Sequence, residues 1–125
     1  MTTLLALFRR PDGGPEALAA FERAYADSHL PLVATTPGLR DLRVRRVSEA
    51  LGAGTDLVVV TEMDFDDRAA LDAGLASDAM RAAGRNLRTI APGLATLLVL
   101  EPGLVLEPGL VLEPAPDLVP AGDQG

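Results

Sequence analysis

Short apolar runs alternate along the chain with segments in which apolar residues recur at helical spacing. Four runs, rich in Leu and Val, are predicted to be strands: residues 3–9, 39–47, 56–65 and 96–101. The run over 3–9 is apolar at both odd and even positions, which predicts a central strand that is covered on both faces. The Gly-rich turn between the second and third runs predicts that these two strands form an antiparallel hairpin.

The first helix is predicted over residues 15–29. Pro15 suits the first helical position, where no N–H is needed. Pro31 disfavours helical geometry at Leu30, so the helix is expected to end there, with His29 in its last turn. One stripe of this segment is apolar or aromatic and is predicted to face the core: Leu18, Phe21, Tyr25, His29 and Leu32.

A second helical region follows the third strand. Asp66 is predicted to be its N-cap, because a carboxylate accepts hydrogen bonds from the first free N–H groups of a helix. Ser77 is predicted to be a second N-cap, so the helix is expected to break there and to restart at Asp78. Pro92-Gly93 is expected to end the region.

The predicted order of elements is β-α-β-β-α-β. Two split β-α-β halves of this kind form a ferredoxin-like α+β sandwich, in which both helices cover one face of a four-stranded antiparallel sheet. The other face then stays open, although the strand over 3–9 is apolar on that side too. A second copy of the same sheet is the simplest cover, so we expect a homodimer with its sheets face to face, an α/β barrel built by two chains.

The end of the chain holds a repeat with a period of six. Leu-Val-Leu-Glu-Pro-Gly occurs twice from residue 98, and Leu-Val-Leu-Glu-Pro-Ala follows. We therefore expect a domain over residues 1–101 and a repetitive arm over 102–125, of which 116–125 are expected to be disordered. The Leu-Val-Leu triplets are too apolar for a solvated linker, which favours an extended arm docked on the partner subunit. The alternative is a duplicated DNA segment that the terminus tolerates.

Composition excludes several kinds of site. The chain has no cysteine and one histidine, so disulfides, thiolate metal sites, cysteine nucleophiles and multi-histidine centres within one chain are excluded. The net charge is −7, and an acidic protein repels phosphate backbones, so no nucleic-acid partner is expected. No apolar stretch reaches 18 residues and no signal peptide is visible, so we expect a cytoplasmic protein without membrane contact.

Two segments resemble the EthD family. The first has the pattern Phe21-x-x-x-Tyr25-x-x-x-His29-Leu-Pro-Leu followed by Pro37-Gly38-Leu39, and the second is the strand end and helix over residues 62–77. The likeness covers the whole predicted domain and implies a dimeric α/β barrel, in agreement with the element order. Other branches of that superfamily include cofactor-free monooxygenases, polyketide cyclases, lactone isomerases and haem enzymes, so the resemblance implies no single activity.

His29 and Tyr25 are the candidate catalytic residues. His29 is the one side chain whose ordinary pKa lies near neutrality, and Tyr25 lies one turn earlier on the same helix face. Together they would hold and protonate an oxygen of a small substrate; the alternative is that His29 caps the helix end and bonds a loop carbonyl. Phe21, Arg43 and Arg45 are candidate substrate-binding residues. The alternative for the two arginines, which share one strand face, is pairing with acids across an interface.

These observations give one function and two alternatives. The first is a homodimer that binds a small, mostly apolar metabolite between sheet and helices, with proton transfer or cofactor-free oxygenation as its chemistry if it is an enzyme. The second is a non-catalytic homodimeric binding or structural module that uses the C-terminal arm as an interaction element, and the third is haem binding through His29. The first needs no cofactor. No metal site is expected, because Asp64, Asp66 and Asp67 stand at a strand end and a helix start, where acids serve as caps.

Overall fold

The computed structural model describes residues 1–103 and contains the predicted succession of elements. The strands are β1 (Thr2–Arg9), β2 (Asp41–Arg46), β3 (Leu57–Phe65) and β4 (Ala95–Leu100). The helical elements are α1 (Gly14–Ala24), the π-helical turn η1 (Tyr25–His29), α2 (Leu30–Val33), α3 (Arg68–Leu75) and α4 (Asp78–Ile90). Each strand begins and ends within two residues of its predicted bounds.

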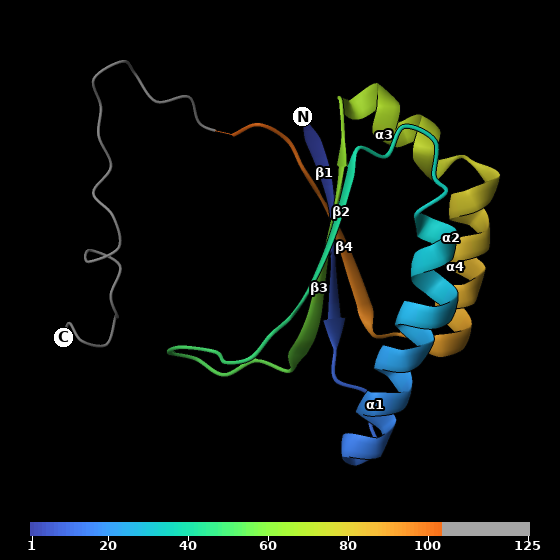
Figure 1. The fold of residues 1–125 in the computed structure, drawn as a ribbon. Coiled ribbons are helices and arrows are strands. Elements are labelled where there is room, and N and C mark those ends of the chain that lie inside the picture. Colours follow the sequence, from blue (N-terminus) through green and yellow to red (C-terminus); the bar gives the residue numbers. More distant parts are fainter. Residues whose placement is uncertain (104–125) are drawn as a thin grey trace, which may run out of the picture.

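The four strands form one antiparallel sheet in the order β2-β3-β1-β4, and the helices cover one of its faces (Figure 1). Helices on one side of an antiparallel sheet, joined in this order, make the ferredoxin-like α+β sandwich that the sequence predicts. The predicted hairpin is confirmed, because β2 pairs antiparallel with β3. This arrangement leaves the second face of the sheet without a cover from the described residues.

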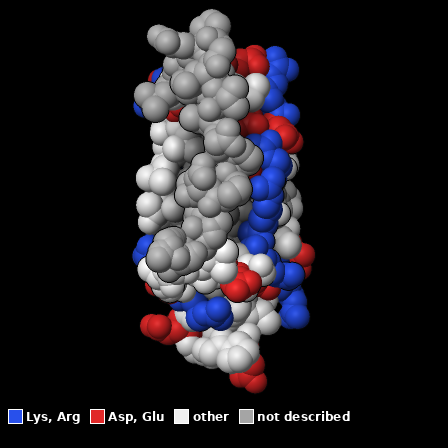
Figure 2. All heavy atoms as spheres, turned by 90° about the vertical axis from the view of Figure 1, so that its left-hand side faces the viewer, with Lys and Arg blue, Asp and Glu red and all other residues white. Residues whose placement is uncertain are grey.

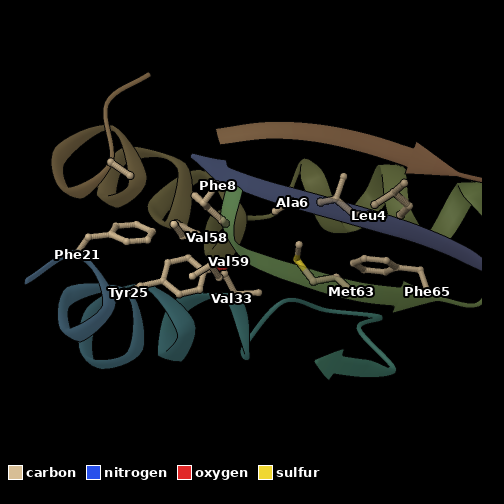
Figure 3. Packing of buried hydrophobic residues seen from close by; sticks show 13 residues of the cluster. Leu4, Ala6, Phe8, Phe21, Tyr25, Val33, Val58, Val59, Met63 and Phe65 are labelled. Carbon is tan, nitrogen blue, oxygen red and sulfur yellow. The ribbon is translucent and has the colours of Figure 1, made fainter. Parts of the chain in front are cut away.

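β1 is the central strand that its two apolar faces predict, since it pairs with β3 on one side and β4 on the other. The side chains of Leu4, Ala6 and Phe8 face the helices and are at most 3% exposed. Leu5 and Leu7 point to the other face and are only half-buried. The side chains on the helix-covered face of β1 therefore form one part of the hydrophobic core, and the rest of the core comes from the helices and β3 (Figure 3).

The first helix does not end at Leu30, so that prediction is wrong. The chain widens into the π turn η1, where the N–H of Leu30 donates to the carbonyl of Tyr25, and continues as α2 to Val33. Pro31 lies in the first turn of α2, where a missing N–H is tolerated. The π turn thus carries the chain past the proline without a break, and it places His29 inside a continuous helical region rather than at its end.

The two predicted N-caps have different outcomes. Ser77 caps α4 as predicted, because its hydroxyl accepts from the N–H of Met80. The cap of α3 is Asp67 rather than Asp66: Asp67 has extended backbone and accepts from the N–H of Ala70 at 2.8 Å. Asp66 instead forms an exposed ion pair with Arg40. The strand ends at Phe65 as predicted, and the helix begins one residue later than expected, at Arg68, so the cap moves to Asp67.

The open face of the sheet has an apolar half and a charged half. Strand registers place a group of leucines on its β1 and β4 side: Leu5, Leu7, Leu98 and Leu100. Leu98 and Leu100 are 41% and 43% exposed. On the β2 and β3 side the same face carries arginine and acidic side chains, which gather along one side of the view in Figure 2.

Three predictions fall on residues that lie outside the described part of the chain. The arm from residue 104 onward, its docking on a partner and the disorder of residues 116–125 all remain predictions, as does the division into 1–101 and 102–125. Leu98, Val99 and Leu100, from the first copy of the repeat, form the second half of β4. Within residues 1–103, no helix is long and apolar enough to cross a bilayer.

Candidate functional site

A cavity of about 120 Å³ lies between the helix-covered face of the sheet and the helices. An apolar cavity of similar size, about 150 Å³, holds one benzene molecule in another protein, so this one suits a single ring or a short branched chain. Its wall is apolar apart from two side chains, Tyr25 and His29. The lining residues from the sheet are Leu4, Ala6, Phe8, Met63 and Leu97, and those from the later helices include Leu75, Met80, Ala83, Gly84 and Leu87.

An aromatic stack holds the polar side of the cavity in place. Phe8, Phe21 and Tyr25 pack with ring centroids 4.9–5.7 Å apart (Figure 3), and the rings of Tyr25 and His29 stack at 5.0 Å with an angle of 25° between them. The helical segment α1–η1 brings the two candidate catalytic residues together, because it directs both side chains toward the sheet. Both are nearly fully buried.

Phe21 does not line the cavity. It is 4% exposed and lies against Phe8 and Tyr25, so it supports the ring of Tyr25 from behind rather than touching the cavity space. Phe21 lies one turn before Tyr25 on the apolar face of the helix. Sequence spacing alone does not distinguish a core residue at this position from one that contacts a ligand. The structure therefore gives this predicted substrate-binding residue a packing position.

The hydroxyl of Tyr25 is held by Thr61 on β3. The two oxygens are 2.6 Å apart, Thr61 is fully buried, and either oxygen can be the donor. Burial raises the pKa of Tyr25 to about 12, against a smaller opposite effect of the Thr61 hydrogen bond. Tyr25 is therefore a neutral hydroxyl at ordinary pH. When Thr61 donates to it, the proton of Tyr25 is available to an oxygen atom of a ligand in the cavity.

His29 is oriented by a hydrogen-bond chain that runs from α4 back to its own helix. Its Nδ1 lies 3.1 Å from Oδ1 of Asn86, the Nδ2 of Asn86 donates to the hydroxyl of Ser28 at 3.3 Å, and Ser28 donates to the carbonyl of Ala24 at 2.7 Å. With the amide of Asn86 fixed in this direction, Nδ1 of His29 carries the proton. Nε2 has no hydrogen-bond partner among residues 1–103.

Burial lowers the pKa of His29 below its ordinary value, and the hydrogen bond with Asn86 opposes this only in part. The ring is therefore neutral at neutral pH and its Nε2 is unprotonated, and His29 lines the apolar cavity. Such a nitrogen can accept a proton from a bound molecule. Sequence reasoning missed Asn86, since the contact joins two helices 57 residues apart and no local spacing points to it.

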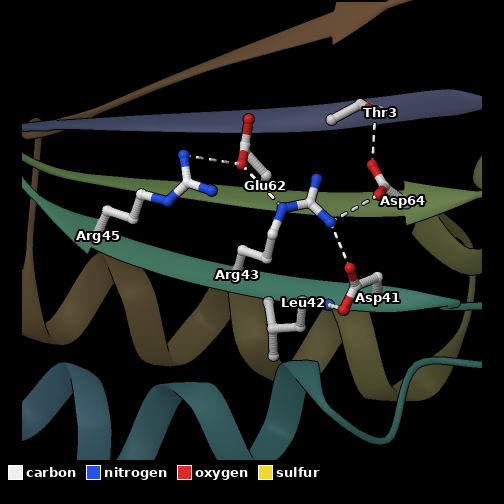
Figure 4. Close-up of polar contacts among 7 residues, drawn as sticks. All are labelled: Thr3, Asp41, Leu42, Arg43, Arg45, Glu62 and Asp64. Atoms are coloured by element: carbon white, nitrogen blue, oxygen red, sulfur yellow. Dashed lines mark hydrogen bonds and ion pairs between the residues drawn. The ribbon is translucent and has the colours of Figure 1, made fainter.

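Arg43 and Arg45 lie across the sheet from the cavity, on its open face. Arg43 contacts Asp64 at 2.9 Å and Glu62 at 3.0 Å and also pairs with Asp41 (Figure 4). Its pKa is raised by hydrogen bonds to these three carboxylates, with Asp64 contributing most. Arg45 is mostly exposed, and its nearest carboxylate oxygen is that of Glu62 at 3.9 Å.

The carboxylates at the end of β3 are occupied by protein groups. Asp64 accepts from Arg43 and from the hydroxyl of Thr3 at 2.6 Å, which lowers its pKa, while Asp66 and Asp67 serve the ion pair and the cap described above. Among residues 1–103, no group of three or more potential ligands could hold a metal ion. The third hypothesis, haem bound through His29, finds no space in this cavity, since a volume of about 120 Å³ is far too small for a porphyrin.

Comparison with known proteins points to one group of structures. No family model and no curated protein matches the chain. The crystal structure of an ethyl tert-butyl ether D (EthD) family protein from Bacillus halodurans C-125 matches with a TM-score of 0.74 and 30% identity, covering 82% of this chain and 99% of that one.

Two more distant structures share the fold. A dimeric ferredoxin-like protein of unknown function from Thermobifida fusca YX has a TM-score of 0.55 and 20% identity, over 79% of this chain and 88% of that one. SnoaB, a cofactor-independent oxygenase from Streptomyces nogalater, has a TM-score of 0.55 and 21% identity, over 84% and 95%. At these identities the likeness shows the fold alone.

Proposed function

The chain belongs to the EthD family, and we propose that it acts as a homodimer that binds a small, largely apolar molecule in the cavity between sheet and helices. The observation that carries this proposal is the chemistry of the cavity wall. It is apolar except for two residues, the neutral His29, whose Nε2 has no described partner, and Tyr25, and the rings of the two residues stack. A small number of polar groups in an apolar wall is typical of a ligand site.

The reaction that this wall supports best is proton transfer. Nε2 of His29 takes a proton from a carbon next to a carbonyl group, the C–H electron pair moves into an enolate, and the imidazolium that forms keeps its Nδ1–H on Asn86. Tyr25, held by Thr61, donates a hydrogen bond to the enolate oxygen. Return of the proton to the same or a neighbouring atom completes the cycle without any other reactant.

Cofactor-free oxygenation shares this first step. An enolate formed at Nε2 of His29 is electron-rich enough to react with molecular oxygen, so the same residues would start either reaction. SnoaB, with the same fold, is described as a cofactor-independent oxygenase, which supports the view that this scaffold can host such chemistry. Proton transfer is the part that residues of this chain perform.

The homodimer is supported by the open face of the sheet. Its leucines on β1 and β4 are partly exposed in the single chain, and a second copy would cover them in a face-to-face arrangement. The related ferredoxin-like protein from Thermobifida fusca is described as dimeric. Arg43 and its carboxylate partners lie on the same face of the sheet, on its β2 and β3 side.

A deuterium-exchange experiment tests the proposed chemistry. The protein is incubated in D₂O with cyclopentanone, a carbon acid that consists of a single ring, and incorporation of deuterium is followed by NMR. We expect catalysed exchange by the wild type, its loss in His29→Gln and no change in Arg23→Gln, a control on the exposed surface of α1.

Three outcomes separate the hypotheses. Exchange that depends on His29 supports the enzyme. Binding of cyclopentanone in the cavity without exchange contradicts the proton-transfer step and favours the non-catalytic binding module. Neither binding nor exchange contradicts the proposed ligand site.

A further inference from the structure

A second hollow adjoins the cavity at helix α4. This groove is lined by Leu75, Met80, Arg81, Gly84, Arg85 and Arg88. Three of these residues, Leu75, Met80 and Gly84, also line the cavity. The cavity and the groove therefore share one wall, and the other residues of the groove are all arginines.

Gly84 marks the junction between the two hollows. Glycine is a poor residue for a helix interior, yet here it stands in the middle of α4. A Cβ atom at this position would meet no atom closer than Nη1 of Arg88, at 3.8 Å. The absence of a side chain thus leaves the junction open, and the guanidinium group of Arg88 lies beside it.

Two of the three arginines of the groove are not neutralised by the described residues. Arg81 forms an ion pair with Asp78 at 2.8 Å, whereas Arg85 and Arg88 make no ion pair within residues 1–103. Both are exposed and lie three residues apart on one helix, so their guanidinium groups can reach the same anion. Unpaired arginines beside an apolar cavity are suited to bind a carboxylate with paired hydrogen bonds.

We propose that the ligand of the cavity is a small apolar carboxylic acid, whose carboxylate is bound by Arg85 and Arg88 while its apolar part passes Gly84 into the cavity. This inference rests on the proposed function of the cavity and adds its substrate class. The cavity volume of about 120 Å³ limits the apolar part to one ring or a short branched chain. The carboxylate fixes one end of the ligand and thereby determines which of its carbon atoms faces His29.

The test compares benzoate with benzyl alcohol, its neutral analogue of similar size. Binding is measured by NMR on protein labelled at the methionine methyl groups, because Met63 and Met80 line the cavity. We expect the wild type to bind benzoate at least about tenfold more tightly than benzyl alcohol. In the double variant Arg85→Gln/Arg88→Gln this preference is expected to disappear while the affinity for benzyl alcohol stays unchanged, and Arg23→Gln serves as the matched control.

Two outcomes overturn different parts of the account. If both probes bind equally and the double substitution changes neither affinity, the carboxylate site is wrong and the cavity remains. If neither probe shifts the signals of Met63 and Met80 in the wild type, the ligand cavity itself is contradicted.

A second pair of variants tests the passage beside Gly84. Gly84→Leu should abolish binding of both probes, and Gly84→Ala, whose Cβ fits, should retain it. Binding of both probes by Gly84→Leu would contradict the passage.

Discussion

The hydrogen bond between Tyr25 and Thr61 tests how the polar side of the cavity is built. The two oxygens are 2.6 Å apart and Thr61 is fully buried, so a Tyr25→Phe substitution leaves the Thr61 hydroxyl without a partner. An unsatisfied buried hydroxyl costs about 1–3 kcal/mol. We therefore expect Tyr25→Phe to lower the free energy of unfolding by about 2 kcal/mol.

Substitution of the partner, Thr61→Val, should lower the free energy of unfolding by less. In Thr61→Val the hydroxyl of Tyr25 loses its partner, but Tyr25 lines the cavity, which has room for a water molecule, so we expect a loss of about 1 kcal/mol. The double variant leaves no polar group unpaired and should also lose only about 1 kcal/mol, because replacing both partners by apolar groups is nearly neutral. The coupling energy between the two positions is then about 2 kcal/mol.

Urea unfolding followed by circular dichroism measures these differences. All variants are compared at one protein concentration, since the stability of the proposed homodimer would depend on concentration. Thr89→Val, at an exposed threonine on α4, is the control and should change the free energy of unfolding by less than about 0.5 kcal/mol. Additive losses, giving about 3 kcal/mol in the double variant, would refute the assignment of this hydrogen bond.

Three further predictions follow from single positions. Burial lowers the pKa of His29 in the folded state, so protonation of this residue favours the unfolded state. The free energy of unfolding should therefore be highest above the ordinary pKa of 6.5 and should fall as the pH drops from there through the folded pKa. Urea titrations of His29→Gln should not show this pH dependence. Asn86→Asp places a carboxylate on Nδ1 and should raise the pKa of His29, which an NMR titration of this single histidine measures without overlap; an unchanged pKa would contradict the contact. Gly74→Ala should destabilise the protein by about 1–3 kcal/mol, because its Cβ would lie 2.8 Å from the ring of Phe65. Gly84→Ala should instead stabilise α4 by up to about 1 kcal/mol. Equal changes in the melting temperature of the two variants would contradict this packing.

The hydrophobic pattern predicted the fold because each element has a local signal. Apolar residues on both faces of residues 3–9 placed β1 in the centre of the sheet, and Ser77 marked the start of α4. The local signal failed at the end of the first helix, where a proline that disfavours helical geometry is accommodated by a π turn. Pro31 was expected to end the first helix, but the π turn at Tyr25–His29 lets the chain continue to Val33.

The candidate site was predictable only on one helix. The four-residue spacing of Tyr25 and His29 is visible in the sequence, and the structure stacks the two rings. Thr61 and Asn86, which hold their polar atoms, come from β3 and α4, so only the tertiary structure reveals them. The same applies to Arg85 and Arg88, whose helical pattern alone is that of an ordinary solvated face.

The proposed function requires the cavity to accept a small apolar molecule beside His29. The most direct measurement is an NMR titration with toluene of protein labelled at its three methionine methyl groups, with the His29 ring signal followed in the same spectra. We predict that the signals of Met63, Met80 and His29 shift together and saturate, while Met1, which is 61% exposed and outside the cavity wall, does not move. Unchanged Met63 and Met80 signals at saturating toluene, or a shift confined to Met1, would contradict the proposed ligand site.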